Sequence, residues 1–244
     1  GSADLLSGKI LGNLFYEPST RTSSSFLAAM LRLGGQVIPI NNVQYSSVSK
    51  GESLPDTVRT LECYSDVIVL RHSAPGSPLY LSQIVKMPVI NAGDGAHEHP
   101  TQALLDIFTM RERLGDLKGM KVTIVGDIVH SRVAKSDVYG LQALGADVTL
   151  CGPSTFLPAS IEKMGVRITS DISQGTADAD VVNVLRIQRE RQEGGFLPSL
   201  REYTRLFGID EDLTADTADR ILELHDGRLY EHAGSYESYL ADRA

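Results

Sequence analysis

Short apolar runs alternate along the chain with longer segments of helical period. The runs are rich in Val and Ile, as in the stretch VIVL before Arg71, and are typical of strands buried on both faces of a parallel sheet. The segments between them repeat apolar residues every three or four positions, which favours helices that cover a sheet. Strands are therefore predicted at residues 10–15, 36–40, 66–70, 89–92, 121–126, 147–151, 167–169 and 180–185.

One helix is predicted between the first four strands and the last four. The stretch HPTQALLDIFTMRERLGDLKG carries an apolar stripe through Ala103, Leu104, Ile107 and Phe108, and the segment from Gly115 ends it. We therefore predict an α/β fold of two domains, residues 1–115 and 116–244, each a mainly parallel sheet flanked by helices. Residues 210–244 form an atypical tail, acidic and less regular, with one amphipathic piece, TADRILELHD.

Composition and charge exclude several classes of protein. A hydrophobic content of 42% and a charged content of 22% are typical of globular domains. The net charge of -8 and the lack of a basic cluster argue against binding to nucleic acid or to an anionic membrane. No apolar run approaches the roughly 18 residues that span a bilayer, and we expect a cytoplasmic protein. Cys63 and Cys151 lie in apolar segments far apart, which predicts buried free thiols.

The stretch EPSTRTSSSF gathers six hydroxyl groups around Arg21, directly after the first predicted strand. A helix predicted to begin near Thr20 would place free backbone N–H groups and the positive end of the helix dipole there. This arrangement favours an anion, and phosphate above all. The alternative is that Ser19 or Thr20 simply caps the helix.

Other cations also follow predicted strands or lie in the connections between them. The Lys50 segment, SSVSKGES, lacks the spacing of a P-loop, and the Arg132 segment, GDIVHSR, lacks the glycine fingerprint of a dinucleotide fold. Arg186 and Gln188 point the same way after the last predicted strand. Ligands of open α/β sheets bind at the carboxyl edge, so these cations predict a local site for an anionic substrate in an acidic protein. The five cations are Arg21, Lys50, Arg71, Arg132 and Arg186.

Two histidines follow the fourth predicted strand. His97 and His99 are two residues apart, but no third ligand stands at a suitable spacing, so no metal site is predicted. A hydrogen-bond donor at the start of a helix is a better role for His99, with Gln102 one turn later on the same face.

Six motifs stand out along the chain: FYEPSTRT, SSVSKGES, VLRH, INAGDGAHEHPTQALLD, VGDIVHSRV and VLRIQRER. Taken together, they resemble the catalytic chains of the aspartate carbamoyltransferase family. They occur in the family's order from about Leu11 to Gly208, and we found no counterpart there for the tail. The resemblance implies transfer of the carbamoyl group of carbamoyl phosphate to the α-amine of L-aspartate, without metal or cofactor. The products would be N-carbamoyl-L-aspartate and phosphate, in pyrimidine biosynthesis.

The resemblance implies a role for each residue that matches a motif. Thr22, Arg71 and His99 would donate to the carbamoyl oxygen, and Gln102 would orient the carbamoyl amine. Residues implied to bind carbamoyl phosphate are Ser19, Thr20, Arg21, Thr22, Ser46, Lys50, Arg71, His99 and Gln102. Those implied to bind aspartate are Lys50, Arg132, Arg186 and Gln188.

The resemblance also implies an assembly, and it leaves alternatives open. Ser46 and Lys50 would reach the active site of a neighbouring subunit, which makes the catalytic unit a homotrimer; regulatory or other pyrimidine-pathway chains are further possible partners. One alternative is a different acceptor such as ornithine, although Arg186 and Gln188 suit a second carboxylate better than an amine. The other is a non-catalytic subunit that binds carbamoyl phosphate or needs an active partner chain.

Overall fold

The computed structural model describes residues 4–40, 51–157, 159–185, 200–208, 220–225 and 228–233. The chain forms two compact units. The first comprises Gly1–Arg113 together with Ser131–Gly140, and the second comprises Leu114–His130 together with Leu141–Ala244. Each unit contains a parallel four-stranded sheet flanked by helices, which confirms the predicted fold class. The exact domain boundary at residue 115 stays a prediction.

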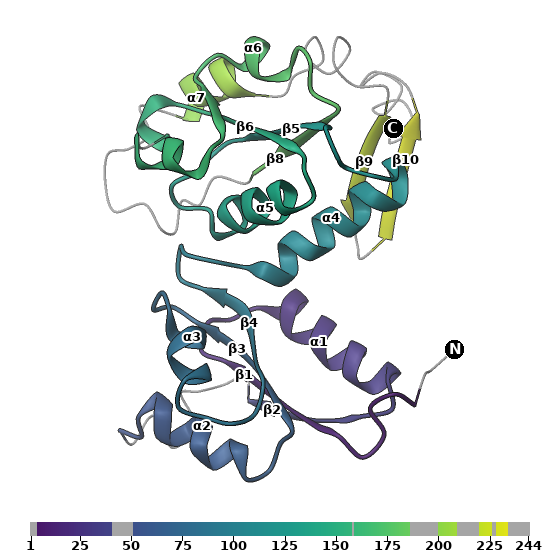
Figure 1. Cartoon of the computed structure of the whole chain (residues 1–244), viewed down its shortest axis with the longest axis vertical. Helices are drawn as coiled ribbons and strands as arrows, with labels where there is room; N and C mark the ends of the chain where they lie inside the picture. Colours follow the sequence, from purple (N-terminus) through teal and green to yellow (C-terminus); the bar gives the residue numbers. More distant parts are fainter. Residues whose placement is uncertain are drawn as a thin grey trace. The chain divides into compact units, whose positions relative to one another are not determined.

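The sheet of the first unit has the strand order β2-β1-β3-β4, and all of its pairings are parallel. Side chains alternate between its two faces, as the period of a strand requires. Ile68 and Leu70 pack with residues of α2 and α3 on one face, whereas Val69 packs with Met30 of α1 on the other. Figure 1 shows α1 on the side of the sheet opposite α2 and α3. The strands are β1 (Ile10–Phe15), β2 (Gln36–Ile40), β3 (Val67–His72) and β4 (Val89–Asp94), and the helices are α1 (Thr20–Arg32), α2 (Leu54–Glu62), α3 (Ser77–Ser82) and α4 (Pro100–Leu114).

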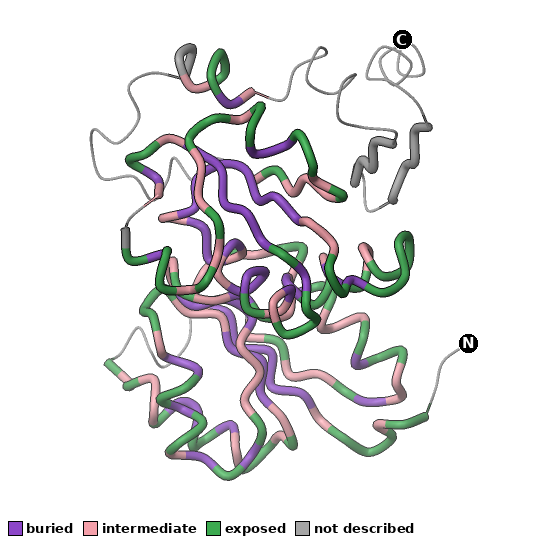
Figure 2. The backbone as a smooth tube through the Cα atoms, turned by 45° about the horizontal axis from the view of Figure 1, so that its top comes forward, coloured by how far each residue is buried: buried purple, intermediate pink, exposed green. Residues whose placement is uncertain are grey.

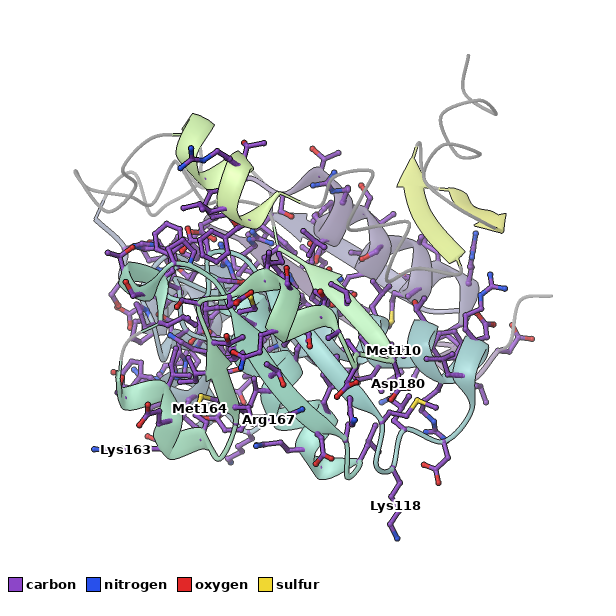
Figure 3. All side chains as sticks on the ribbon, turned by 90° about the horizontal axis from the view of Figure 1, so that it is seen from above. Met110, Lys118, Lys163, Met164, Arg167 and Asp180 are labelled. Atoms are coloured by element: carbon purple, nitrogen blue, oxygen red, sulfur yellow. The ribbon has the colours of Figure 1, made fainter. Side chains whose placement is uncertain are left out.

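The sheet of the second unit has the order β7-β6-β5-β8, again parallel throughout. Buried residues run through its strands, as they do in the first sheet (Figure 2). The exposed side chains of Lys118 and Lys163 extend outward from this unit (Figure 3). Its strands are β5 (Lys121–Val125), β6 (Asp147–Cys151), β7 (Arg167–Thr169) and β8 (Val181–Val184), and its helical segments are α6 (Ile172–Thr176), α7 (Leu200–Phe207), Ser154–Phe156 and Ala159–Met164. Helix α5 (Arg132–Ala143) begins in the first unit and ends in the second.

All eight predicted strands are present, with ends that differ by no more than two residues. The apolar stripe of α4 is only half buried, because Ala103 and Ile107 are covered while Leu104 and Phe108 are exposed. The prediction of buried thiols is right for Cys151 and wrong for Cys63, which follows the last turn of α2 on its exposed side.

Part of the tail forms a hairpin that the sequence analysis did not predict. Strands β9 (Arg220–His225) and β10 (Arg228–Ala233) pair antiparallel, with Leu224 opposite Leu229. The alternation of Leu222, Glu223 and Leu224 fits a strand, but it is too short a pattern to separate from the amphipathic period of a helix.

None of the helices in the described part of the chain is long and apolar enough to cross a membrane.

Candidate active site

The polar stretch after β1 becomes the first turn of α1. Ser19 precedes the helix, but its side chain makes no capping hydrogen bond. Its Oγ instead accepts a hydrogen bond of 3.2 Å from Nη1 of Arg71, and Oγ1 of Thr22 lies 3.5 Å from the same nitrogen. The first turn contains no acidic residue. Ser19 therefore does not cap the helix through its side chain, and the N-terminal N–H groups of α1 remain suited to an anion.

Arg71, the penultimate residue of β3, brings a positive charge to this helix end. Its side chain is largely covered, and its Nε donates to Oε2 of Glu17 at 3.2 Å. Burial lowers the pKa of Arg71, as does the nearby charge of Arg132, while Glu17 opposes the shift. Arginine remains protonated throughout the physiological range in spite of such shifts. A fixed cation thus faces the hydroxyl groups of the α1 turn.

Arg132, at the start of α5, is the second cation of the site. It is only 4% exposed, and its Nη2 donates to Oε2 of Glu17 at 2.9 Å. Its Nη1 is buried and has no hydrogen-bond partner among the described residues. A buried donor without a partner carries a cost of desolvation that an anionic ligand would remove. Arg132 therefore holds one half of its guanidinium fork ready for a ligand.

Gly93 makes room for this arginine in β4. A Cβ atom at Gly93 would lie 2.8 Å from Nη1 of Arg132, and the φ of +120° at this position disfavours any residue with a side chain. Glycine is therefore required both by the backbone and by the guanidinium group that packs against it.

Glu17 is shared by two arginines, which leaves the group of three with a net positive charge. The same carboxylate oxygen accepts from Arg71 and from Arg132. All three residues belong to the first unit. Because one carboxylate cannot neutralise two guanidinium groups, the cluster attracts an anion to a place where little water screens the charges.

His99 lies between β4 and α4 and is 6% exposed. Asp94 holds the loop that precedes it, because its side chain accepts from the backbone N–H groups of Gly76 and Glu98 at 2.7 and 2.9 Å. The backbone N–H of His99 donates to Oγ of Ser136 on α5 at 2.9 Å, and Ser136 in turn donates to Glu98. The loop that carries His99 is thus held by hydrogen bonds at both of its ends.

The environment of His99 keeps its imidazole neutral at physiological pH. Burial lowers its pKa to about 4, helped by the charges of Arg71 and Arg132. Nδ1 lies 3.5 Å from the hydroxyl oxygen of Thr101. A Thr101 hydroxyl that donates to Nδ1 selects the tautomer with its proton on Nε2, which makes Nε2 a hydrogen-bond donor.

Gln102 follows His99 by one turn of helix, as the sequence indicated. Its Nε2 donates to Oδ1 of Asp106 at 3.0 Å. Burial raises the pKa of Asp106 to about 6, and the hydrogen bond from Gln102 opposes that shift.

The remaining predicted site residues are not joined by contacts to this cluster. Thr20 and Arg21 lie in the first turn of α1 and are exposed. Ser46, Lys50, Arg186 and Gln188 lie outside the described residues. The described residues contain no group of three or more His, Cys, Asp or Glu side chains that could hold a metal ion.

Sequence reasoning missed four residues that shape the site. Glu17 stands at the head of the polar stretch, so an acid beside a cluster of predicted cations was a usable signal. Gly93 stands at the end of a predicted strand, where a glycine indicates a close approach. Ser136 and Asp106 gave no signal, because their partners are defined only by the fold. The four are Glu17, Gly93, Asp106 and Ser136.

Two family models match the chain. The carbamoyl-phosphate-binding domain of aspartate/ornithine carbamoyltransferases matches residues 1–112, and the aspartate/ornithine-binding domain matches residues 118–227. The second match extends past Gly208, so the expectation that the resemblance ends there is wrong.

Individual relatives agree with the family models. The chain is 50% identical over 238 residues to the aspartate carbamoyltransferase catalytic subunit of Halothermothrix orenii. The matched region covers 97% of this chain and 75% of the relative. The catalytic subunit of M. jannaschii aspartate transcarbamoylase superimposes with a TM-score of 0.72 at 38% identity, over 88% of this chain and 72% of the other. Trypanosoma cruzi aspartate transcarbamoylase, in complex with carbamoyl phosphate and aspartate, gives 0.69 at 37% identity, over 77% and 67%. The chain thus spans about two thirds to three quarters of these relatives.

Proposed function

Because the chain belongs to the aspartate/ornithine carbamoyltransferase family, we propose that it transfers the carbamoyl group of carbamoyl phosphate to the α-amine of L-aspartate. The products are N-carbamoyl-L-aspartate and phosphate, an early intermediate of pyrimidine biosynthesis and its by-product. The observation that carries the proposal is the pair of guanidinium groups on Glu17, beside the open N-terminus of α1. Relatives with the aspartate carbamoyltransferase name, and structures that hold its substrates, support the same reaction.

Carbamoyl phosphate binds with its phosphate at the first turn of α1. The hydroxyl groups of Ser19 and Thr22 face Arg71, whose Nη1 lies 3.2 and 3.5 Å from the two hydroxyl oxygens. The backbone N–H groups of the same turn add further donors. Thr20 and the exposed Arg21 occupy the same turn and add donors and positive charge. A helix N-terminus and a guanidinium fork together suit a phosphate dianion.

The carbamoyl oxygen receives hydrogen bonds from Thr22, Arg71 and the neutral His99. These donors stabilise the charge that develops on this oxygen when the amine attacks. The neutral state of His99 matters, because an imidazolium next to two arginines would raise the electrostatic cost of the ligand-free site. Gln102 accepts from the carbamoyl amine and fixes the plane of the group.

Aspartate binds through its carboxylates to Arg132, whose Nη1 is buried without a partner in the described part of the chain. Lys50, Arg186 and Gln188 complete this part of the site in the proposal, and they lie outside the described residues. A carboxylate suits these cations, whereas the distal ammonium group of ornithine would be repelled by them. Aspartate is therefore favoured over ornithine as the acceptor.

The reaction proceeds by addition and elimination at the carbonyl carbon. The α-amine of aspartate forms the new C–N bond and pushes an electron pair onto the carbonyl oxygen. Collapse of this intermediate breaks the C–O bond to phosphate, which leaves with the bridging oxygen and its electron pair. The proton lost by the amine passes to the departing phosphate. Positioning and charge neutralisation of two anions supply most of the rate enhancement.

The proposal extends to assembly and location. The catalytic unit is a homotrimer in which Ser46 and Lys50 enter the site of a neighbouring subunit, with regulatory or other pyrimidine-pathway chains as further partners. The name catalytic subunit, carried by the relatives, supports an oligomer. The cytoplasm is the proposed compartment.

The test is formation of carbamoyl aspartate by the purified chain from carbamoyl phosphate and aspartate, with ornithine as the parallel acceptor. We expect turnover with aspartate alone. Arg132→Ala and Arg186→Ala should each raise the KM for aspartate at least tenfold, about the effect of one charged hydrogen bond. Arg167→Ala, which removes an exposed arginine of the second unit (Figure 3), should leave the KM unchanged. No turnover with either acceptor would refute the proposal, and turnover with ornithine alone would refute the choice of aspartate.

A further inference from the structure

Asp106 is an acid that the proposed reaction does not use. It lies one turn after Gln102 on α4 and is partly buried. Burial raises its pKa to about 6, and no cation among the described residues lowers this pKa. A carboxylate removed from water without a positive partner is costly, and an apolar residue would pack there at lower cost. Among the described residues, its side chain has one hydrogen-bond partner, the amide of Gln102, which indicates what it does.

The contact fixes which way the Gln102 amide faces. Nε2 of Gln102 and Oδ1 of Asp106 are 3.0 Å apart, an ordinary hydrogen-bond length. An ionised carboxylate can only accept hydrogen bonds, so the amide must turn its NH₂ group toward Asp106. The oxygen Oε1 is then directed away from Asp106 and is available as an acceptor.

The backbone N–H group that such a glutamine usually binds is already occupied. A glutamine in the third position of a helix commonly reaches back to the backbone N–H of the residue before the helix. Here that residue is His99, and its N–H donates to Oγ of Ser136 at 2.9 Å. Within the described part of the chain, Oε1 of Gln102 has no hydrogen-bond partner. Ser136 and Asp106 thus free this oxygen and orient it.

We propose that Asp106 is a positioning residue that turns the amide of Gln102 so that its Oε1 accepts an N–H of the carbamoyl amine. The identity of the ligand rests on the proposed function, whereas the orientation of the amide rests on the contact with Asp106. The arrangement selects for a ligand that carries an N–H at this place. Acetyl phosphate, which has a methyl group there, gains nothing from the oriented oxygen.

A double-mutant cycle tests this role. Asp106→Leu should lower kcat/KM for carbamoyl phosphate about five- to tenfold, the effect of one hydrogen bond, and leave kcat/KM for acetyl phosphate within about twofold. In the Gln102→Ala background the same change should cost less than about twofold, because a positioning residue has no effect without the residue it positions. Glu112→Gln, an exposed acid on the same helix, is the matched control and should behave as the wild type.

Equal losses in both backgrounds, or equal losses for both phosphates, would overturn the proposal, and so would no loss at all. Asp106→Asn keeps an acceptor oxygen and should retain more activity than Asp106→Leu. If Asp106→Leu fails to fold by circular dichroism, the Asn variant carries the cycle, with a smaller loss of up to about threefold that must vanish in the Gln102→Ala background.

A binding measurement separates this proposal from the proposed function. Phosphonoacetamide carries the same amine as carbamoyl phosphate, and inorganic phosphate lacks it. By calorimetry, Asp106→Leu should weaken phosphonoacetamide about five- to tenfold and leave phosphate unchanged. If Asp106→Leu shows this contrast but the wild-type chain shows no turnover, the proposed reaction is refuted and the role of Asp106 is kept. Equal weakening of both ligands would refute the role of Asp106, whatever the turnover.

Discussion

Acidification is expected to destabilise this protein through His99. The folded-state pKa is lowered to about 4 from the ordinary 6.5, because the imidazole is buried beside two guanidinium groups. Above pH 6.5 the imidazole is neutral in both the folded and unfolded states and contributes no difference. As the pH falls further, the unfolded chain gains a proton that the folded chain does not bind, so the free energy of unfolding falls until the pH reaches about 4.

The magnitude follows from the shift. One pKa unit corresponds to about 1.4 kcal/mol, so between about pH 7.5 and about pH 5 the loss through His99 is about 2 kcal/mol, and it approaches about 3 kcal/mol below pH 4. This is a large part of the stability of an ordinary domain. The same lowered pKa keeps the imidazole of His99 neutral at the pH of the reaction. Measurements of stability and of activity therefore both test this pKa.

Urea unfolding of the wild type and of His99→Gln, at about pH 7.5 and about pH 5, measures the effect. The variant retains a hydrogen-bond donor but does not titrate, so it should lose about 2 kcal/mol less than the wild type between the two pH values. His97→Gln removes an imidazole from the same loop, where it is half exposed, and should keep the extra loss due to His99. Identical pH dependence in the wild type and His99→Gln would refute a neutral buried imidazole.

Three further predictions concern the site. Glu17→Ala should lower kcat/KM for aspartate about 10- to 100-fold, because both guanidinium groups lose a charged hydrogen bond; unchanged kinetics would show that the carboxylate does not position them. Gly93→Ala should displace Arg132 and raise the KM for aspartate about tenfold or more, whereas Gly115→Ala, which also has a positive φ but open space around it, should affect stability only. The acidic limb of the kcat profile, expected near pH 6 because a protonated Asp106 gains an O–H donor and no longer fixes the orientation of its amide partner, should be absent in Asp106→Asn; a limb that persists would assign it to another group.

The strands were predictable because their signal is local. Parallel strands buried on both faces are continuous runs of Val and Ile, and the turn residues between them mark their ends. The polar turn before α1, where we propose that phosphate binds, was predictable for a similar reason, since a strand, a polar turn and a helix occur in direct succession around Ser19 and Thr22. Those features depend on neighbours in the sequence and not on the rest of the fold.

The contacts of Glu17, Gly93 and Asp106 could not be predicted by such reasoning. Glu17 contacts Arg71 across 54 residues and Arg132 across 115, and no local pattern indicates that one carboxylate serves both. Gly93 is required by a side chain that arrives from α5, and Asp106 matters through a rotamer of Gln102. Long-range pairing and side-chain orientation are outcomes of packing, so only the structure reveals them.

Burial shifts the pKa values of Arg71, His99 and Asp106, yet it leaves the three groups in different states because their ordinary pKa values differ. Arg71 starts so far above neutrality that a lowered pKa still leaves a full positive charge. His99 starts near neutrality, and the same cause makes it a neutral donor. Asp106 starts well below, so a pKa raised to about 6 leaves it mostly ionised at pH 7 and able to accept from Gln102. At neutral pH, a guanidinium cation, a neutral imidazole and a carboxylate therefore coexist among partly buried residues, and we propose that they serve the phosphate, the carbonyl oxygen and the amide of Gln102. Because the pKa of Asp106 is about 6 and that of His99 is about 4, we expect the acid, and not the histidine, to set the lower edge of the working pH range.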